Sequence, residues 1–100
     1  MVFVRKLKET YEGVERQSLL LECELNKDNV NCVWKKYGKV IEEDDRIKIE
    51  VNGRTQKFKI SNLMLSDKQN ITCAAIRGRK IEEELATTSS RIIVTGLDSF

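Results

Sequence analysis

The sequence predicts an all-β domain in which two antiparallel sheets pack face to face. Apolar and polar residues alternate in several short stretches along the 100 residues, and a period of two is typical of strands with one buried face. Turn signals separate these stretches at the spacing expected of a sandwich. Cys23, Trp34 and Cys73 follow one another in that order, which is typical of two sheets packed across a central tryptophan.

Eight strands are predicted, and the connections between them have their own signals. The strands cover residues 2–11, 18–25, 31–36, 39–41, 46–51, 55–60, 70–76 and 85–95. Glu12-Gly13 is predicted to turn the chain after the first strand, and Asn52-Gly53 is the strongest hairpin signal in the sequence. Residues 61–67 mix two leucines with Ser, Asn and Asp, which predicts a short crossover between the sheets with one helical turn.

The alternation also identifies the buried face of each strand. Apolar residues occupy the odd positions from Leu19 to Leu25 and the even positions from Val30 to Trp34, so Cys32 is predicted to point into the core beside Trp34. The same period recurs in three later sets: Ile47, Ile49 and Val51; Gln56, Phe58 and Ile60; and Ile71, Cys73 and Ala75. The predicted core comprises Leu19, Leu21, Cys23, Cys32, Trp34, Ile47, Ile49, Phe58, Ile60, Leu63, Leu65, Ile71, Cys73, Ala75, Ile92 and Val94.

The composition argues against several classes of function. A net charge of +2, from 18 basic and 16 acidic residues, disfavours a nucleic-acid partner, which would require a clustered basic face. No apolar run is long enough to span a membrane. The chain has no histidine, which removes the commonest general base and the commonest metal ligand. Because it also has no phosphate-binding loop and no nucleophile motif, the sequence predicts neither an enzyme nor a cofactor.

A set of short motifs extends over nearly the whole chain, from about Phe3 to Val94. It comprises Glu12-Gly13, Leu21-Glu22-Cys23-Glu24-Leu25, Val33-Trp34-Lys35-Lys36-Tyr37-Gly38-Lys39, Asp45-Arg46-Ile47, Asn52-Gly53, Phe58-Lys59-Ile60, Leu63, Leu65, Asp67 and Cys73. Together these motifs resemble the I-set immunoglobulin domains of giant intracellular muscle proteins, such as titin, obscurin, twitchin and myosin-binding protein C. The resemblance implies an immunoglobulin-like (I-set) two-sheet Greek-key sandwich over residues 1–95, with residues 96–100 as a tail or the start of a linker.

The resemblance also implies structural roles for particular residues. The structural signature comprises Cys23, Trp34, Cys73, Arg46, Asp67 and Leu63. Arg46 is expected to form an ion pair with Asp67, as a basic residue at this position often does in the family. Cys23 and Cys73 are expected to face each other, either as the thiols typical of cytosolic proteins or as a disulfide that would stabilise the domain by roughly 4 kcal/mol.

Two segments depart from the family's pattern. Gln69 and Ile71 replace the usual glycine and tyrosine before the second cysteine, so the hydrogen bond of the tyrosine corner is absent. The connection that follows Cys73 is unusually long, and its added sequence, residues 77–84, is dense in charge. The charged residues are Arg77, Arg79, Lys80, Glu82, Glu83 and Glu84. We name residues 77–84 the charged hairpin. It is a candidate protein-interaction element, and the alternative is a solvated loop whose charges prevent edge-to-edge aggregation.

The resemblance implies a non-catalytic structural and protein-interaction module of a sarcomeric or cytoskeletal filament protein in the cytoplasm. Such a module would bear load, contact neighbouring domains of its parent chain and dock proteins such as actin, myosin or another immunoglobulin domain. The alternative is an extracellular domain of a cell-adhesion molecule or receptor. In that setting Asn70-Ile71-Thr72 would be a usable glycosylation sequon.

Overall fold

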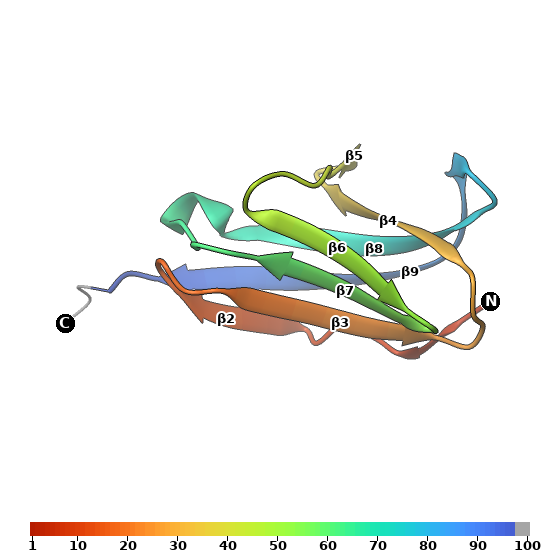
Figure 1. Ribbon diagram of the computed structural model, residues 1–100, viewed down its shortest axis with the longest axis horizontal. Helices are drawn as coiled ribbons and strands as arrows, with labels where there is room; N and C mark the ends of the chain where they lie inside the picture. Colours follow the sequence, from red (N-terminus) through yellow and green to blue (C-terminus); the bar gives the residue numbers. More distant parts are fainter. Residues whose placement is uncertain (98–100) are drawn as a thin grey trace.

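The computed structural model, which describes residues 1–97, consists of two layers of strands (Figure 1). One sheet has the strand order β1-β3-β7-β6 and the other has the order β2-β9-β8-β4-β5. The elements are β1 (Phe3–Arg5), β2 (Thr10–Val14), β3 (Leu19–Leu25), β4 (Asn31–Lys36), β5 (Lys39–Val40), β6 (Ile47–Asn52), β7 (Thr55–Ile60), the 3-10 helix η1 (Leu65–Asp67), β8 (Gln69–Arg77) and β9 (Lys80–Thr95). The predicted two-sheet all-β sandwich is confirmed.

The predicted first strand is divided between the two sheets. β1 pairs with β3 in an antiparallel ladder, whereas β2 lies parallel to β9 in the other sheet. The parallel pairing extends from Thr10 opposite Arg91 to Val14 opposite Thr95. The N-terminus and the end of the described chain lie at opposite ends of the sandwich (Figure 1), so β2 and β9 both run toward the C-terminal end.

The turn predicted at Glu12-Gly13 was wrong, because both residues lie inside β2. The chain turns after Val14, where the N–H of Gln17 donates to the carbonyl of Val14 at 3.0 Å and Arg16 adopts a φ of 73°. The role of Gly13 is to leave room for the side chain of Leu63 and not to turn the chain. A Cβ at this position would overlap the Cδ1 atom of Leu63.

The core lies between the sheets and contains most of the predicted residues. Those confirmed as buried are Leu21, Cys23, Trp34, Phe58, Ile60, Leu63, Ile71, Cys73, Ala75, Ile92 and Val94, and those only partly buried against them are Leu19, Cys32, Ile47 and Ile49. The prediction for Leu65 was wrong, because it is 53% exposed. Leu65 begins η1, where the two-residue period of the strands no longer applies.

Several buried residues were absent from the predicted core. Phe3, Leu7 and Tyr11 are buried, but they recur every four residues because the chain crosses from one sheet to the other between β1 and β2. Leu25 is also buried. The alternation from Leu19 to Leu25 does indicate this burial, so Leu25 could have been included in the predicted core. Gln56 is almost fully buried and donates weakly to the carbonyl of Val30 at 3.5 Å.

Candidate protein-interaction hairpin and structural signature

Trp34 lies at the centre of the signature. β4 presents it to the core, where it is 1% exposed and lies opposite Cys73 of β8 in the ladder register. Its ring contacts that of Phe58 on the other sheet, with centroids 5.0 Å apart and planes inclined at 38°. Such a tilted contact adds to the free energy gained by burying the two rings, so Trp34 joins the two sheets at the middle of the sandwich.

The three cysteines are free thiols that lie in the same core cluster as this tryptophan or pack against it. Cys23 and Cys73 are fully buried, and Cys32 is half-buried on β4. Hydrogen bonds with Cys23 and Cys32, together with burial, raise the pKa of the Cys73 thiol above its usual range. Because the thiolate is the reactive form of cysteine, these contacts disfavour the reactive form of Cys73.

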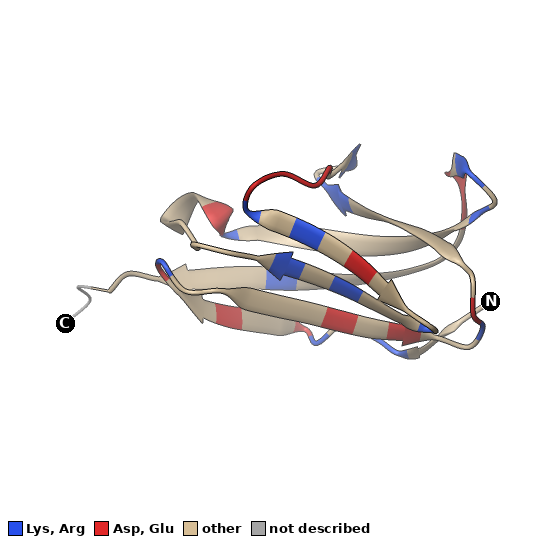
Figure 2. Cartoon of the chain, viewed as in Figure 1, with Lys and Arg blue, Asp and Glu red and all other residues tan. Residues whose placement is uncertain are grey.

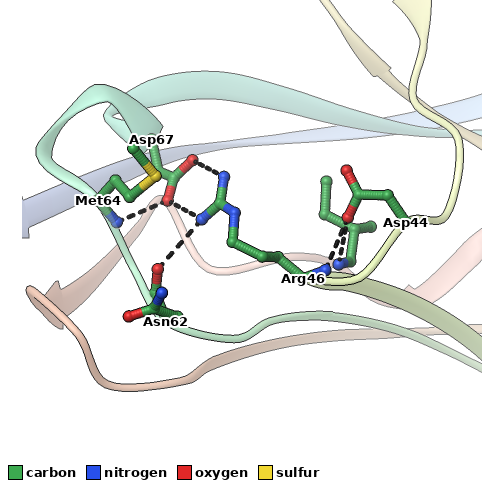
Figure 3. A network of polar contacts seen from close by, with 6 residues as sticks. Asp44, Arg46, Asn62, Met64 and Asp67 are labelled. Carbon is green, nitrogen blue, oxygen red and sulfur yellow. Dashed lines mark hydrogen bonds and ion pairs between the residues drawn. The ribbon is translucent and has the colours of Figure 1, made fainter.

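Arg46 and Asp67 lie side by side (Figure 3), and the 3-10 helix η1 that ends at Asp67 lies at the C-terminal end of the sandwich (Figure 1). Two parallel hydrogen bonds join the guanidinium to the carboxylate, at 2.8 Å from Nη1 and 3.0 Å from Nη2. Nη1 also donates to the carbonyl of Asn62 at 3.2 Å, and the N–H of Met64 donates to Asp67 at 2.8 Å. These contacts attach the crossover before β8 to the start of β6.

The ionisation of this pair follows from the same contacts. The hydrogen bonds from Arg46 hold the pKa of Asp67 below its usual range against the opposing effect of burial. The hydrogen bonds to Asp67 raise the pKa of Arg46. Nearby, the carboxylate of Asp44 accepts the N–H groups of Arg46 and Ile47, both at 2.8 Å, and these bonds lower its pKa.

Leu63 fixes the crossover to the neighbouring turn. Its side chain is buried at 1% exposure and packs over Gly13, where a larger residue would overlap it. Its N–H donates to the carbonyl of Gln17 at 2.9 Å, and its carbonyl accepts from the N–H of Arg16 at 2.7 Å. The signature residues therefore act in two groups, one around Trp34 in the core and one around Leu63 and Asp67 at one end.

The charged hairpin is mostly strand, which corrects the prediction that the last strand begins at residue 85. β9 begins at Lys80, and the turn itself consists of Gly78 and Arg79. Ala75 lies opposite Ala86, but Ile76 lies opposite Glu84 and Arg77 lies opposite Lys80. Leu85 and residues 81–83 are therefore extra residues of β9 that bulge from the ladder.

Ion pairs determine how this bulged segment lies. Glu84 pairs with Lys35 of β4 at 2.6 Å, and Glu83 pairs with Arg77 at 3.2 Å and Lys80 at 3.8 Å. Arg79 and Glu82 are exposed, and neither forms an ion pair within residues 1–97. Four of the six charges of the hairpin are thus paired within the domain, one of them with Lys35 of β4, and one charge of each sign is left without an ion pair.

The sequence prediction of this element missed its apolar and supporting residues. Ile81 is 43% exposed and Leu85 is 37% exposed, so the bulged strand presents two large apolar side chains among its charges. Asn31 donates from Nδ2 to the carbonyl of Gly78, which attaches the hairpin turn to the start of β4. Ile81 and Leu85 could have been identified from the sequence, because they are apolar residues among charged ones. The contacts made by Lys35 and Asn31 could not, because they depend on strand register.

Across residues 1–97, no group of three or more His, Cys, Asp or Glu side chains is placed to hold a metal ion. No helix in that range has the length and apolar character needed to cross a membrane.

Comparisons with known proteins identify muscle relatives. A family model for the immunoglobulin I-set domain matches residues 1–88. Cardiac-type myosin-binding protein C of Ambystoma mexicanum is 38% identical over 52 residues, which are 52% of this chain and 10% of that protein. Its counterpart in Gallus gallus is 30% identical over 73 residues, covering 67% of this chain and 6% of that protein. The chain thus spans a tenth or less of these relatives.

Solved structures of muscle proteins share the same fold. Domain I10 of titin superposes with a TM-score of 0.81 at 26% identity, covering 94% of this chain and 97% of that one. A chain of the complex between titin M10 and an obscurin-like 1 immunoglobulin domain gives a TM-score of 0.80 at 19% identity, with 97% and 95% covered, and this second likeness concerns the fold alone. The matched family model, supported by these likenesses, shows that the chain belongs to the immunoglobulin I-set family.

Proposed function

We propose that this domain is a non-catalytic, load-bearing and protein-docking module of a sarcomeric filament protein in the cytoplasm. The observation that carries the proposal is the parallel pairing of β2 with β9. Its curated relatives are cardiac myosin-binding proteins C, and this chain spans only a small part of their length. This fraction is consistent with one domain in a chain of many.

The direction of the two strands supports the load-bearing role. β2 and β9 run side by side in the same direction, and the chain leaves the domain at opposite ends (Figure 1). Tension applied to the termini pulls β2 and β9 in opposite directions along their length. The hydrogen bonds between them are then sheared together instead of being opened one at a time, so the pair resists force as a unit.

The docking role is assigned to the charged hairpin. It lies at the same end of the sandwich as the N-terminus (Figure 1), where it can contact a neighbouring domain of the parent chain or a separate protein. Arg79, Glu82, Ile81 and Leu85 supply exposed groups of both charges and apolar character. Partners of this kind include actin, myosin and another immunoglobulin domain, and titin M10 forms a complex with such a domain.

The two hairpin turns of the domain provide a matched test of docking. Arg79 follows Gly78 in the turn of the charged hairpin, and Arg54 follows Gly53 in the turn between β6 and β7. Arg79→Glu should weaken binding to purified actin filaments, myosin filaments or a muscle immunoglobulin domain, whichever the wild-type domain binds in co-sedimentation and pull-down assays. Arg54→Glu, which makes the same charge change in the same kind of turn, should leave that binding intact.

Reversing all three basic residues of the hairpin extends the test. The triple variant Arg77→Glu, Arg79→Glu, Lys80→Glu should abolish binding while leaving the melting temperature nearly unchanged, because the ion pairs it breaks are exposed and contribute little to stability. Binding that persists in the triple variant, or that Arg54→Glu weakens equally, would refute the docking role.

An extracellular adhesion or receptor domain is the second candidate. Asn70 of the sequon Asn70-Ile71-Thr72 is exposed on β8, as glycosylation would require. Non-reducing mass spectrometry of the protein from its native tissue separates the candidates. A Cys23–Cys73 disulfide or a glycan on Asn70 would support the extracellular candidate, whereas three free thiols and an unmodified Asn70 would support the sarcomeric one.

A further inference from the structure

The outer face of the four-stranded sheet arranges its side chains in rows that cross three strands. The register places Leu20 of β3 opposite Lys59 of β7, and Lys59 opposite Lys48 of β6. All three residues point away from the core, because their neighbours on each strand are buried or partly buried. We name these three residues the lysine row.

The adjacent row has the opposite character. Lys57 of β7 lies between Glu22 of β3 and Glu50 of β6, so both cross-strand neighbours of this lysine carry the opposite charge. Cross-strand pairs of opposite charge stabilise a sheet, whereas like charges placed directly opposite destabilise it. Figure 2 shows basic positions next to one another on β6 and β7, with acidic positions on β3.

The two charges of the lysine row form no ion pair within residues 1–97. Lys48 and Lys59 are both exposed, and neither ammonium lies within 4.0 Å of a carboxylate of residues 1–97. Asp44 is close enough for its charge to attract Lys48, whereas the residues directly opposite Lys59 are Lys48 and Leu20, neither of them acidic. The register therefore places two like charges directly opposite each other on β6 and β7, an arrangement that disfavours the sheet.

An apolar side chain completes the row. Leu20 is 44% exposed beside Lys59, although the other outward positions of β3 are the glutamates Glu22 and Glu24. The row thus presents two positive charges at cross-strand spacing, about 5 Å between Cβ atoms, followed by an apolar contact. A single surface leucine is ordinary. Leu20 indicates a binding surface only because it lies in one row with two lysines that face each other.

We propose that the lysine row is a docking site for an acidic segment of a partner protein. The segment would place two carboxylates over Lys48 and Lys59 and an apolar side chain over Leu20. Glu22 and Glu50 repel further acidic groups on the neighbouring row, which fixes the orientation of the segment because like-charge contacts disfavour the alternatives. Two lysines bordered by these glutamates form too small a basic area for nucleic acid or an anionic membrane.

This site is distinct from the charged hairpin and goes beyond the function proposed above. The lysine row lies on the β1-β3-β7-β6 sheet, whereas the hairpin joins β8 to β9 in the other sheet. A variant that disrupts one surface should therefore leave binding at the other unchanged, and the failure of either proposal does not bear on the other.

The test uses a synthetic peptide in which Glu and Leu alternate, and a second peptide with Lys in place of Glu. Amide chemical shifts of the isotope-labelled domain, followed by NMR at low salt, should respond to the acidic peptide at Leu20, Lys48 and Lys59 and should not respond to the basic one. Lys59→Gln should weaken the acidic peptide by about two- to fivefold, as expected for one exposed ion pair, and added salt should weaken it further.

Lys57→Gln is the matched control, because it removes the same charge from the same strand two residues away. It should weaken the acidic peptide less than Lys59→Gln does, and the shift changes should stay on the lysine row. Equal weakening by the two variants, no binding by the wild-type domain, or equal binding of both peptides would overturn the proposal. Concentration-dependent dimerisation that Lys59→Gln abolishes would overturn it too, since a second copy would then be the occupant.

Discussion

Arg46 and Asp67 form a two-pronged ion pair that connects the start of β6 to the 3-10 helix before β8, with hydrogen bonds of 2.8 and 3.0 Å. A planar guanidinium matched to a carboxylate in this way is both stronger and more directional than a single contact. This helix lies at the C-terminal end of the sandwich (Figure 1), so the pair stabilises the crossover that lies beside the exit of the chain.

Removing the charge of Asp67 should make the stability difference depend on pH. The folded-state pKa of Asp67 lies below the unfolded value of about 3.9. Its contribution is therefore fully present above that unfolded value and is lost as the pH falls through the folded pKa. We expect Asp67→Asn to lower the free energy of unfolding by about 1–2 kcal/mol at pH 7, and by much less at pH 2.

Urea denaturation of the wild-type domain and Asp67→Asn at the two pH values measures this directly. Asp44 also titrates in this range, but it is present in both proteins and its effect cancels in their difference. A stability difference that is the same at pH 7 and pH 2 would show that the carboxylate charge of Asp67 does not stabilise the fold.

Gly13→Ala should destabilise the domain through Leu63. The added methyl would overlap Leu63 Cδ1, which is buried and cannot move into solvent, and overpacking of this kind costs about 1–3 kcal/mol. In a Leu63→Ala background the same change should cost much less, because the overlapping atom is gone. Thermal or urea unfolding of the four proteins of this double-mutant cycle gives the coupling free energy, and additive effects would contradict the close approach.

The lysine row should respond oppositely to two equivalent substitutions. Lys59→Gln removes repulsion from Lys48 and should raise the free energy of unfolding, whereas Lys57→Gln removes attraction to Glu22 and Glu50 and should lower it. Each change should be about 0.2–1 kcal/mol at low salt and smaller at high salt. Equilibrium unfolding in urea measures both, and changes of the same sign would contradict the charge pattern assigned to the two rows.

The sequence predicts the sandwich because period-two alternation survives in most strands. It also places Trp34 and the two cysteines around it, since their burial follows from that alternation. The alternation fails where the chain changes direction between layers. Phe3, Leu7 and Tyr11 are buried at a spacing of four because the chain crosses between sheets there, and Leu65 is exposed because η1 interrupts the strand pattern.

The candidate interaction surfaces were harder to predict than the core. The charge of residues 77–84 is visible in the sequence, but the bulges that expose Ile81 and Leu85 depend on how β9 aligns with β8. The lysine row is invisible without strand register, because Leu20, Lys48 and Lys59 come from three strands. The sequence suggests a turn at Gly13 instead of a close approach to Leu63. That approach is a contact between distant parts of the chain, which the sequence alone does not reveal.

Glu15 offers a way to remove one hydrogen bond between β2 and β9 without deleting a core side chain. Its N–H donates to the carbonyl of Thr95 at 2.8 Å, which continues the ladder between β2 and β9. Glu15→Pro removes this donor, and Glu15→Ala keeps it while losing the same side chain. The proline variant should be less stable than the alanine variant by about 0.5–1.5 kcal/mol.

Single-molecule stretching of the domain between its termini tests the load-bearing role most directly. Shearing of the β2–β9 pair predicts that Glu15→Pro unfolds at a clearly lower force than the wild-type domain, whereas Glu15→Ala unfolds near the wild-type force. Equal unfolding forces for Glu15→Pro and Glu15→Ala would contradict the assignment of mechanical resistance to this pair of strands.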